Sequence, residues 1–230
     1  MDKSATYDAT RDRVEHYFDR SATKVWERLT SDAPVSGVRA TVRAGRDRMR
    51  DLMLAQLPAD LRGARVLDAG CGTGAMAVEL ATRGADVVAV DISPKLIKIA
   101  EARCPDDLRT QITFASGDML SPELGQFDHA LAMDSMIYYG AESVARMLAG
   151  VGPRITTSMI FTLAPRTPLL MTMWRVGKIF PSSDRSPSMI PESCARVSRA
   201  LNALGAGGTL REVERVNSGF YISTALEFRP

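Results

Sequence analysis

The stretch VLDAGCGTG, residues 66–74, is the feature that most constrains what this chain can fold into. An apolar pair and an aspartate lead into three glycines at alternate positions, Gly70, Gly72 and Gly74, and AMAVELATR follows directly. Glycine loses much conformational entropy on folding, so a cluster at fixed spacing indicates a backbone that turns sharply or approaches something closely. The stretch therefore predicts a strand, a tight turn and a helix in succession.

The same alternation of strand and helix patterns continues along the chain. Strand-like runs are ARVLD, ADVVAVD, QITFASGD, FDHALAMD and RITTSMIFTL, and helical patterns are AMAVELATRG, AESVARMLAG and the KLIKIAEAR that follows Ser93-Pro94. TLREVERV and GFYISTALEF, joined by Asn217-Ser218-Gly219, predict a C-terminal hairpin. These patterns predict an α/β fold, a doubly wound and mostly parallel seven-stranded sheet with right-handed crossovers.

Two amphipathic helical patterns precede this core, over residues 8–29 and 38–57, and Pro58 ends the second. The expected organisation is an N-terminal helical lid over residues 1–60 and a core over residues 61–230. Tyr17, Phe18 and Trp26 on the first helix are candidates to close over a ligand and exclude water, and Tyr17 is the one expected in the cofactor site. The alternative is that this helix is docked and that its aromatic side chains are core contacts.

Three acids stand where predicted strands end: Asp68, Asp91 and Asp118. In a doubly wound sheet, ligands bind beyond the carboxyl ends of the strands, where a glycine turn presents backbone N–H groups. Asp68 before the glycines would repel a pyrophosphate and attract an ammonium group. This favours S-adenosylmethionine over a dinucleotide, although GCGTGA can be stretched to fit the dinucleotide pattern GxGxxA.

The other two acids fit the same ligand. Asp91 is placed to accept hydrogen bonds from both ribose hydroxyls, which its charge strengthens. Asp118 is suited to the exocyclic amine of adenine, with Met119 as an apolar neighbour of the ring. The alternative is that all three acids are solvated strand-end caps at the rim of the sheet.

Composition excludes several other classes. A formal net charge of +2 is too mild for a nucleic-acid partner, and no run reaches the ~18 apolar residues of a membrane span. Three cysteines and a polar N-terminus without a signal core favour reduced thiols in the cytoplasm. Two histidines, with no CxxC or HxxxH pair, argue against a protein-bound metal. Cys71 has no base nearby in sequence, which favours a packing role in the turn.

Several motifs carry a family resemblance. VLDAGCGTG, VVAVDIS, SGDML and FDHALAMDSMIYY resemble the Rossmann-like S-adenosylmethionine methyltransferases, over roughly residues 60–165. AMDSMIYY followed by FTLAPRTPLLMTMWRVGKIFPSSDRSPSMIP resembles the magnesium-protoporphyrin O-methyltransferases of (bacterio)chlorophyll synthesis, over nearly the full chain. The resemblance implies methylation of a propionate carboxylate of Mg-protoporphyrin IX, giving the monomethyl ester. The magnesium then belongs to the substrate, and the porphyrin-binding subunit of magnesium chelatase is an implied partner.

The resemblance and the strand-end pattern together define a candidate cofactor site. Its expected members are Tyr17, Asp68, Gly70, Cys71, Gly72, Gly74, Asp91, Ile92, Asp118, Met119 and Met133. Asp134 and Tyr138, in MDSMIYYG, are the candidate catalytic residues because this loop holds substrate and catalytic groups in methyltransferases of this fold. Many relatives carry histidine where Tyr138 stands, and plant-type members have a tyrosine near Thr30. A base is therefore not established, and Tyr138 either donates a hydrogen bond to the propionate or packs against the cofactor.

A carboxylate acceptor needs no strong base, since an acid of this kind has a pKa near about 4.3. Segment 163–189 is expected to be an inserted substrate-binding segment, with Arg166, Trp174, Arg175, Lys178 and Arg185 as candidates. Apolar and cationic side chains together suit a flat apolar ring with anionic tails. The alternatives are an amphipathic helix packed on the core and a peripheral contact with a membrane surface.

Two rival functions fit the same core motifs. The first is a small-molecule O-methyltransferase acting on a phenol or quinol, which would need a base or a metal to remove the proton. The second is a non-catalytic module that binds S-adenosylmethionine and porphyrin without methyl transfer.

Overall fold

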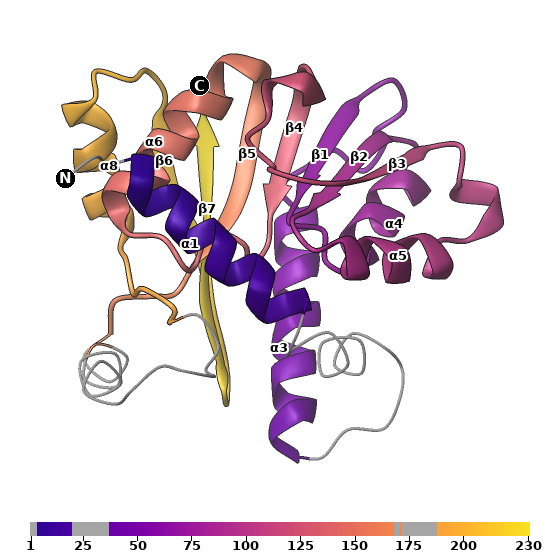
Figure 1. The fold of residues 1–230 in the computed structure, drawn as a ribbon, viewed down its shortest axis with the longest axis horizontal. Helices are drawn as coiled ribbons and strands as arrows, with labels where there is room; N and C mark the ends of the chain where they lie inside the picture. The colour runs from indigo at the N-terminus through magenta and orange to yellow at the C-terminus, as the bar shows by residue number, and fades with distance from the viewer. Residues whose placement is uncertain (1–3, 20–36, 168–170, 172–187) are drawn as a thin grey trace.

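The computed structural model describes residues 4–19, 37–167, 171 and 188–230. Within these ranges the chain forms a seven-stranded sheet of order β3-β2-β1-β4-β5-β7-β6 with helices around it (Figure 1). The strands are β1 Arg65–Ala69, β2 Asp86–Asp91, β3 Ile112–Ser116, β4 Phe127–Ala132, β5 Ile155–Leu163, β6 Thr209–Ser218 and β7 Tyr221–Arg229. The doubly wound, mostly parallel, seven-stranded fold expected from the sequence is confirmed.

Strands β1 to β5 run parallel, and β7 pairs antiparallel with both β5 and β6. The predicted hairpin is therefore present, with Gly219 at φ 60° and Phe220 between its two strands. β6 is an edge strand, and its sequence TLREVERVNS carries four charged residues, which discourages pairing with another chain.

The central strands are buried on both faces, as their continuous apolar sequences predict. Neighbouring residues alternate between the two layers: Val66 and Val87 pack with α3 and α4, and Leu67 and Val88 pack with α6 and α8. The helices are α1 Ser4–Tyr17, α3 Gly37–Leu54, α4 Ala75–Thr82, α5 Pro94–Arg103, α6 Ala141–Val151 and α8 Cys194–Ala203. The helix expected after Ser93-Pro94 is α5, whose N-terminus is capped by the Ser93 side chain.

The two N-terminal helices hold different places. α3 packs against β6 and β7 and is part of the core, since Met49 and Met53 are completely buried. A Cβ added at Gly45 would lie 2.8 Å from the Tyr221 side chain, so helix and strand are in close contact there. α1 instead crosses in front of β7 and ends over the top of α3 (Figure 1). Among the described residues of the predicted lid, α1 has the position of a cover, since Tyr7, Arg11 and Val14 line the cavity.

Along the described part of the chain, no helix combines the length and the apolar character needed to cross a bilayer.

Candidate functional site

A cavity of about 370 Å³ opens where β1, β2 and β4 end, between the glycine turn, α1 and α3. It lies at the edge of the sheet where the topology predicts ligand binding. The candidates that line it are Asp68, Gly70, Cys71, Gly72, Asp91, Ile92, Asp118, Met119, Met133, Asp134 and Tyr138. Residues far apart in the sequence are therefore brought to one crevice.

The glycine turn folds back over β2. Gly70 has φ 82°, and the N–H groups of Gly70 and Cys71 donate to the Val90 carbonyl at 2.7 and 3.0 Å. A Cβ added at Gly70 would come within 2.5 Å of the Ser135 Cβ, so the turn also depends on close approach of the loop after β4. Gly74 directly precedes α4, and a Cβ added there would lie 3.1 Å from the Ala100 Cβ, which gives Gly74 a packing role outside the cavity lining.

Asp68 is a buried carboxyl at the floor of this cavity. Its Oδ2 atom has no hydrogen-bond partner among the described residues. Burial, reinforced by the nearby Asp91, raises the pKa of the Asp68 carboxyl to about 7. A buried polar atom without a partner is unusual in a native protein and indicates a group that a ligand satisfies. A cationic group is the partner that such a carboxyl would favour.

Asp91 is buried at the end of β2, and the backbone fixes its orientation. Its Oδ2 atom accepts from the Gly72 N–H and its Oδ1 atom from the Ser93 N–H, both at 2.9 Å. Burial raises the pKa of this carboxyl to about 6, although these two bonds work in the opposite direction. Each carboxylate oxygen can accept a second hydrogen bond, so the arrangement can still hold a diol.

Asp118 has partners that the sequence did not indicate. Its Oδ1 atom accepts from the Tyr7 hydroxyl and from the Leu120 N–H, both at 2.8 Å. Its Oδ2 atom accepts from Arg11 Nη1 at 3.3 Å. The Tyr7 ring also stacks on Tyr139, with centroids 5.3 Å apart. Helix α1 is thereby attached at the position that was expected to hold adenine.

Of the aromatic residues expected on the lid, Phe18 lines the cavity and Tyr17 does not, while Trp26 lies outside the described residues. Phe18, at the end of α1, is buried and lines the cavity, whereas Tyr17 is half-buried and is not among the lining residues. The two rings meet edge to face, with centroids 5.2 Å apart. Periodicity identified the helix and not which of two adjacent aromatic residues points inward.

Asp134 joins residues from four parts of the fold. Its carboxylate forms an ion pair with Arg46 of α3 and accepts from the Tyr221 hydroxyl of β7 at 3.0 Å. Its N–H donates to Thr162 Oγ1 of β5 at 2.8 Å, and that hydroxyl donates back to Oδ1 at 3.3 Å. Asp134 is also the one non-glycine residue with positive φ, 56°, in the described chain. Strained backbone of this kind is common at functional sites.

Tyr138 is buried beside this cluster. Burial, followed by the charge of Asp134, raises the pKa of its hydroxyl well above the usual range, while Arg46 acts in the opposite direction. The hydroxyl therefore stays protonated near neutral pH and can donate a hydrogen bond. It is a poor candidate for a general base.

The two histidines and the Cys71 thiol are poor candidates for a base or nucleophile at this site. His129 lies in β4 against Ser158 at 2.9 Å, and burial lowers its pKa. His16 is exposed on α1, and neither histidine lines the cavity. Burial raises the pKa of the Cys71 thiol well above its ordinary value, which agrees with a packing role. Within the described ranges, no cluster of side chains suits a metal ion.

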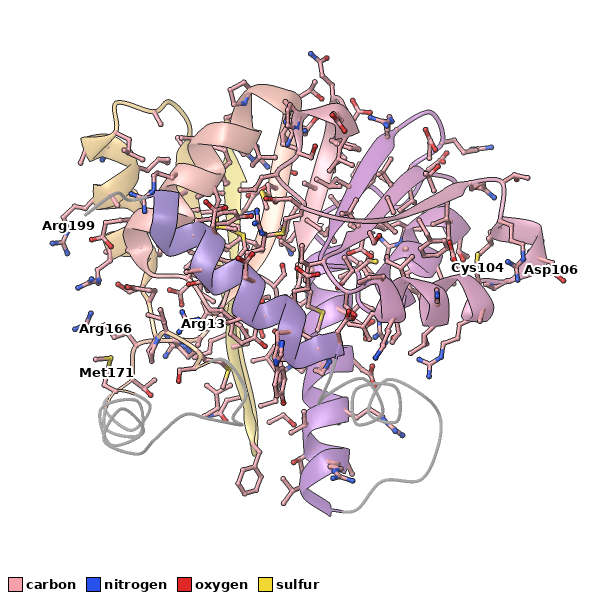
Figure 2. All side chains as sticks on the ribbon, viewed as in Figure 1. Arg13, Cys104, Asp106, Arg166, Met171 and Arg199 are labelled. Atoms are coloured by element: carbon pink, nitrogen blue, oxygen red, sulfur yellow. The ribbon has the colours of Figure 1, made fainter. Side chains whose placement is uncertain are left out.

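The predicted substrate segment is described only at its ends. Arg166 is exposed and does not line the cavity, and Figure 2 shows it at the edge of the molecule near Met171. Trp174, Arg175, Lys178 and Arg185 lie outside the described residues, as does Thr30.

The two ends of that segment meet beside the cavity loop. The Glu192 N–H donates to the Ala164 carbonyl at 2.9 Å, and the Ile190 N–H donates to the Ile137 carbonyl at 2.8 Å. The buried Glu192 carboxylate accepts from the Ala141 N–H at the start of α6 at 3.1 Å. The segment therefore starts and ends next to the loop that carries Tyr138.

Comparisons with known proteins agree with this geometry. A family model described as magnesium-protoporphyrin IX methyltransferase C-terminus matches residues 132–230, and a methyltransferase domain model matches residues 66–152. The magnesium-protoporphyrin O-methyltransferase of Rhodobacter capsulatus is 56% identical over 97% of this chain and 98% of its own length.

A solved structure and a second family extend the comparison. The magnesium protoporphyrin IX methyltransferase from Synechocystis PCC 6803 with bound SAH superimposes with a TM-score of 0.81. It is 28% identical, over 96% of this chain and 100% of that one. A ubiquinone biosynthesis O-methyltransferase of Xanthomonas oryzae is 38% identical, but over only 34% of this chain.

Proposed function

The chain belongs to the magnesium-protoporphyrin O-methyltransferase family, and we propose that it methylates one propionate carboxylate of Mg-protoporphyrin IX to give the monomethyl ester of (bacterio)chlorophyll synthesis. It is an S-adenosylmethionine-dependent methyltransferase with the Rossmann-like fold. The observation that supports the proposal most is the match to the Rhodobacter protein over nearly the whole length of both chains. That match includes the part of the chain beyond the general methyltransferase core.

The residues of the cavity fit the donor. The unpartnered Oδ2 atom of Asp68 suits the donor's ammonium group, and Asp91 suits its ribose diol. The glycine turn leaves room for close approach of a ligand. Gly70 and Gly72 both have positive φ, which glycine adopts with little strain and residues with a side chain do not. When bound, S-adenosylmethionine supplies a methyl group made electrophilic by its sulfonium. The chain's own residues then bind and orient the two reactants and exclude water.

The acceptor's chemistry explains the absence of histidine from the cavity lining. A propionate is ionised near neutral pH, so its oxygen can attack without a general base. The protonated Tyr138 hydroxyl can orient the carboxylate by donating to one of its oxygens. Alignment of the reacting atoms can contribute about 7–11 kcal/mol to lowering the barrier in favourable cases.

A phenol or quinol acceptor is the less favourable alternative. Such an acceptor must lose a proton, and His16 and His129 both lie outside the cavity lining. The match to the ubiquinone enzyme covers a third of the chain, which is the extent expected for a shared donor-binding core.

Further parts of the proposal concern partners and location. We assign the porphyrin to the segment 163–189, whose two ends are next to Tyr138. We also expect substrate transfer from the porphyrin-binding subunit of magnesium chelatase and a cytoplasmic enzyme with peripheral contact at a photosynthetic membrane. Copurification with that subunit and flotation with vesicles of photosynthetic lipids would test these two expectations.

The decisive experiment combines the purified protein, Mg-protoporphyrin IX and S-adenosylmethionine with a methyl label. The expected product is a porphyrin that carries one labelled methyl group and loses it on mild alkaline hydrolysis, as an ester does. Reactions with a quinol acceptor form the comparison. If both ligands bind but no ester forms, the protein is a binding module and the proposed activity is wrong.

A further inference from the structure

One wall of the cavity is basic. Arg43, Arg46 and Arg50 all line it, and they lie on α3 at spacings of three and four residues. Asp47 of the same helix also lines the cavity and pairs with Arg50 at 2.8 Å, so the wall keeps an excess of positive charge. Such spacing places side chains on one face of a helix. The donor-binding acids Asp68 and Asp91 come from the strand ends instead. The cavity therefore combines an acidic floor, suited to a cation, with a basic wall suited to an anion.

Arg46 is the arginine of this wall whose position is most constrained. Its side chain is 17% exposed, and it is paired with Asp134, which is 9% exposed. Asp134 is in turn fixed by the Tyr221 and Thr162 hydroxyls. The backbone of α3 is held by the close contact of Gly45 with Tyr221, one residue before Arg46. A guanidinium held in this way is preorganised to receive a planar anion.

Arg46 also lies near the candidate catalytic loop. Its charge is felt at Tyr138 and at Tyr221, where it works against the rise in pKa that burial causes. Arg46 and Tyr138 both line the cavity, so one anion bound there can meet both groups. The two groups together offer a cationic contact and a neutral donor.

We propose that Arg46, positioned by Asp134, binds the carboxylate of the acceptor that receives the methyl group. This inference rests on the proposed function, and it differs from the sequence-based expectation, which placed the substrate cations in segment 163–189. A guanidinium has five N–H donors, and a single carboxylate uses at most two of them. Arg46 can therefore contact Asp134 and a second carboxylate together.

In the methyl transfer, one bond forms and one bond breaks. One carboxylate oxygen is held by Arg46, and a lone pair of the other forms the bond to the methyl carbon. The carbon–sulfur bond of the donor breaks and its electron pair stays on sulfur, so no proton moves. Because Asp134 already offsets part of the Arg46 charge, the bound carboxylate keeps its nucleophilicity. The ester group that forms is uncharged, so this end of the product loses its attraction to Arg46 and is released more readily.

The carboxylate that Arg46 binds could also belong to the methyl donor, because S-adenosylmethionine carries a carboxylate on its amino-acid end. The experiment therefore needs one arm for each carboxylate. Binding of Mg-protoporphyrin IX is compared with binding of its dimethyl ester, by porphyrin absorbance. Binding of S-adenosylhomocysteine is compared with binding of methylthioadenosine, which lacks the amino acid, by calorimetry.

Arg46→Gln is the test variant, and Arg46→Lys retains the charge without the planar fork. We expect the wild-type protein to prefer the diacid over the diester by about 10-fold or more, as a charge-assisted contact allows. Arg46→Gln should lose that preference, and Arg46→Lys should keep part of it. Arg48→Gln is the matched control, since Arg48 is 64% exposed on the same helix and pairs with Glu214.

The outcomes separate the possibilities. An unchanged preference for the diacid in Arg46→Gln, with S-adenosylhomocysteine still bound, overturns the inference. So does a loss confined to the preference for S-adenosylhomocysteine over methylthioadenosine, which would assign Arg46 to the donor. If Arg46→Gln fails to bind either ligand, the comparison rests on Arg46→Lys, whose KM for porphyrin should rise more than its kcat falls. Failure of the wild-type protein to form an ester contradicts the proposed function but not carboxylate binding by Arg46.

Discussion

At the scale of single residues, Asp68 connects ligand binding to proton release. In the ligand-free protein its buried carboxyl has a pKa of about 7, so near neutral pH a large share of molecules hold it protonated. A cation placed beside it favours the ionised form. Binding of the donor or its product should therefore expel a proton from this carboxyl.

We predict that S-adenosylhomocysteine binding at pH 6.5 releases a substantial fraction of one proton and weakens as the pH falls further. Calorimetry in buffers of different ionisation enthalpy measures the number of protons released on binding. Asp68→Asn should abolish the release and weaken binding by about 10-fold or more, since the ion pair is lost. Asp60→Asn, which alters an exposed surface pair with Arg62, is the control. Equal proton release in the Asp68 variant would exclude this carboxyl as the source.

The glycine turn offers a second prediction at this scale. Gly63 and Gly70 have nearly the same φ, 80° and 82°, but an added Cβ meets nothing within 4 Å at Gly63 and the Ser135 side chain at Gly70. Both alanine variants bear the strain of left-handed backbone, about 1–2 kcal/mol. Gly70→Ala should cost at least about 1 kcal/mol more, because Ser135 must move.

Urea unfolding of the two variants measures the difference, and Ser135→Gly in the Gly70→Ala background should recover part of it. Equal losses of unfolding free energy in Gly63→Ala and Gly70→Ala would mean that the contact with Ser135 is unimportant.

At the scale of elements, α1 is held to the site by a small number of polar contacts. The Tyr7 hydroxyl and the Arg11 guanidinium both reach Asp118, and the Tyr7 ring stacks on Tyr139. Near the other end of the helix, Lys95 Nζ donates to the Asp19 carbonyl at 2.6 Å. These polar contacts add to the packing of Val14, Tyr17 and Phe18 on the core.

We predict that Tyr7→Phe speeds hydrogen exchange of the α1 amides by about 5- to 10-fold, because a hydrogen bond worth about 1 kcal/mol is lost. Mass spectrometry of peptides from residues 4–19 measures this. Arg13→Ala is the matched control: Arg13 is exposed on α1 (Figure 2), and its hydrogen bonds to other described residues are to Ala9 and Thr10 of the same helix. Similar exchange in both variants would show that Asp118 does not hold the helix.

Elements also show which parts of the site were predictable from sequence. Asp68 and Asp91 were identified because the end of a strand and a following glycine turn or helix start are local signals. The Arg46–Asp134–Tyr221–Thr162 cluster was missed apart from Asp134, since its members come from α3, the loop after β4, β7 and β5. The contact of Tyr7 with Asp118 spans 111 positions and likewise has no local signature. Packing between distant elements decides such contacts.

At the scale of the whole molecule, the two buried carboxyls make stability depend on pH. In the unfolded chain an aspartate has a pKa near about 3.9. In the folded, ligand-free protein, burial raises the pKa of Asp68 to about 7 and that of Asp91 to about 6. Between these values the folded chain binds more protons than the unfolded chain. Their contribution to stability is therefore fully present at low pH and lost as the pH rises toward 7.

We predict that the free energy of unfolding contributed by these groups falls between pH 4 and pH 7, on the order of 5 kcal/mol in total. Urea unfolding at several pH values, without ligand, measures the trend. Asp68→Asn should flatten it, since one of the two titrating groups is removed. A variant whose pH dependence matches that of the wild-type protein would contradict the pKa assigned to Asp68.

The joined ends of segment 163–189 bear on how such proteins diversify. Backbone hydrogen bonds from Glu192 to Ala164 and from Ile190 to Ile137 hold the two ends of the segment in place. These bonds do not involve the residues between the two ends. Insertions, deletions or wholesale replacement there need not shift the register of β5 or the start of α6. On the proposal that this segment holds the porphyrin, acceptor preference can change there while the donor site at the strand ends keeps its geometry.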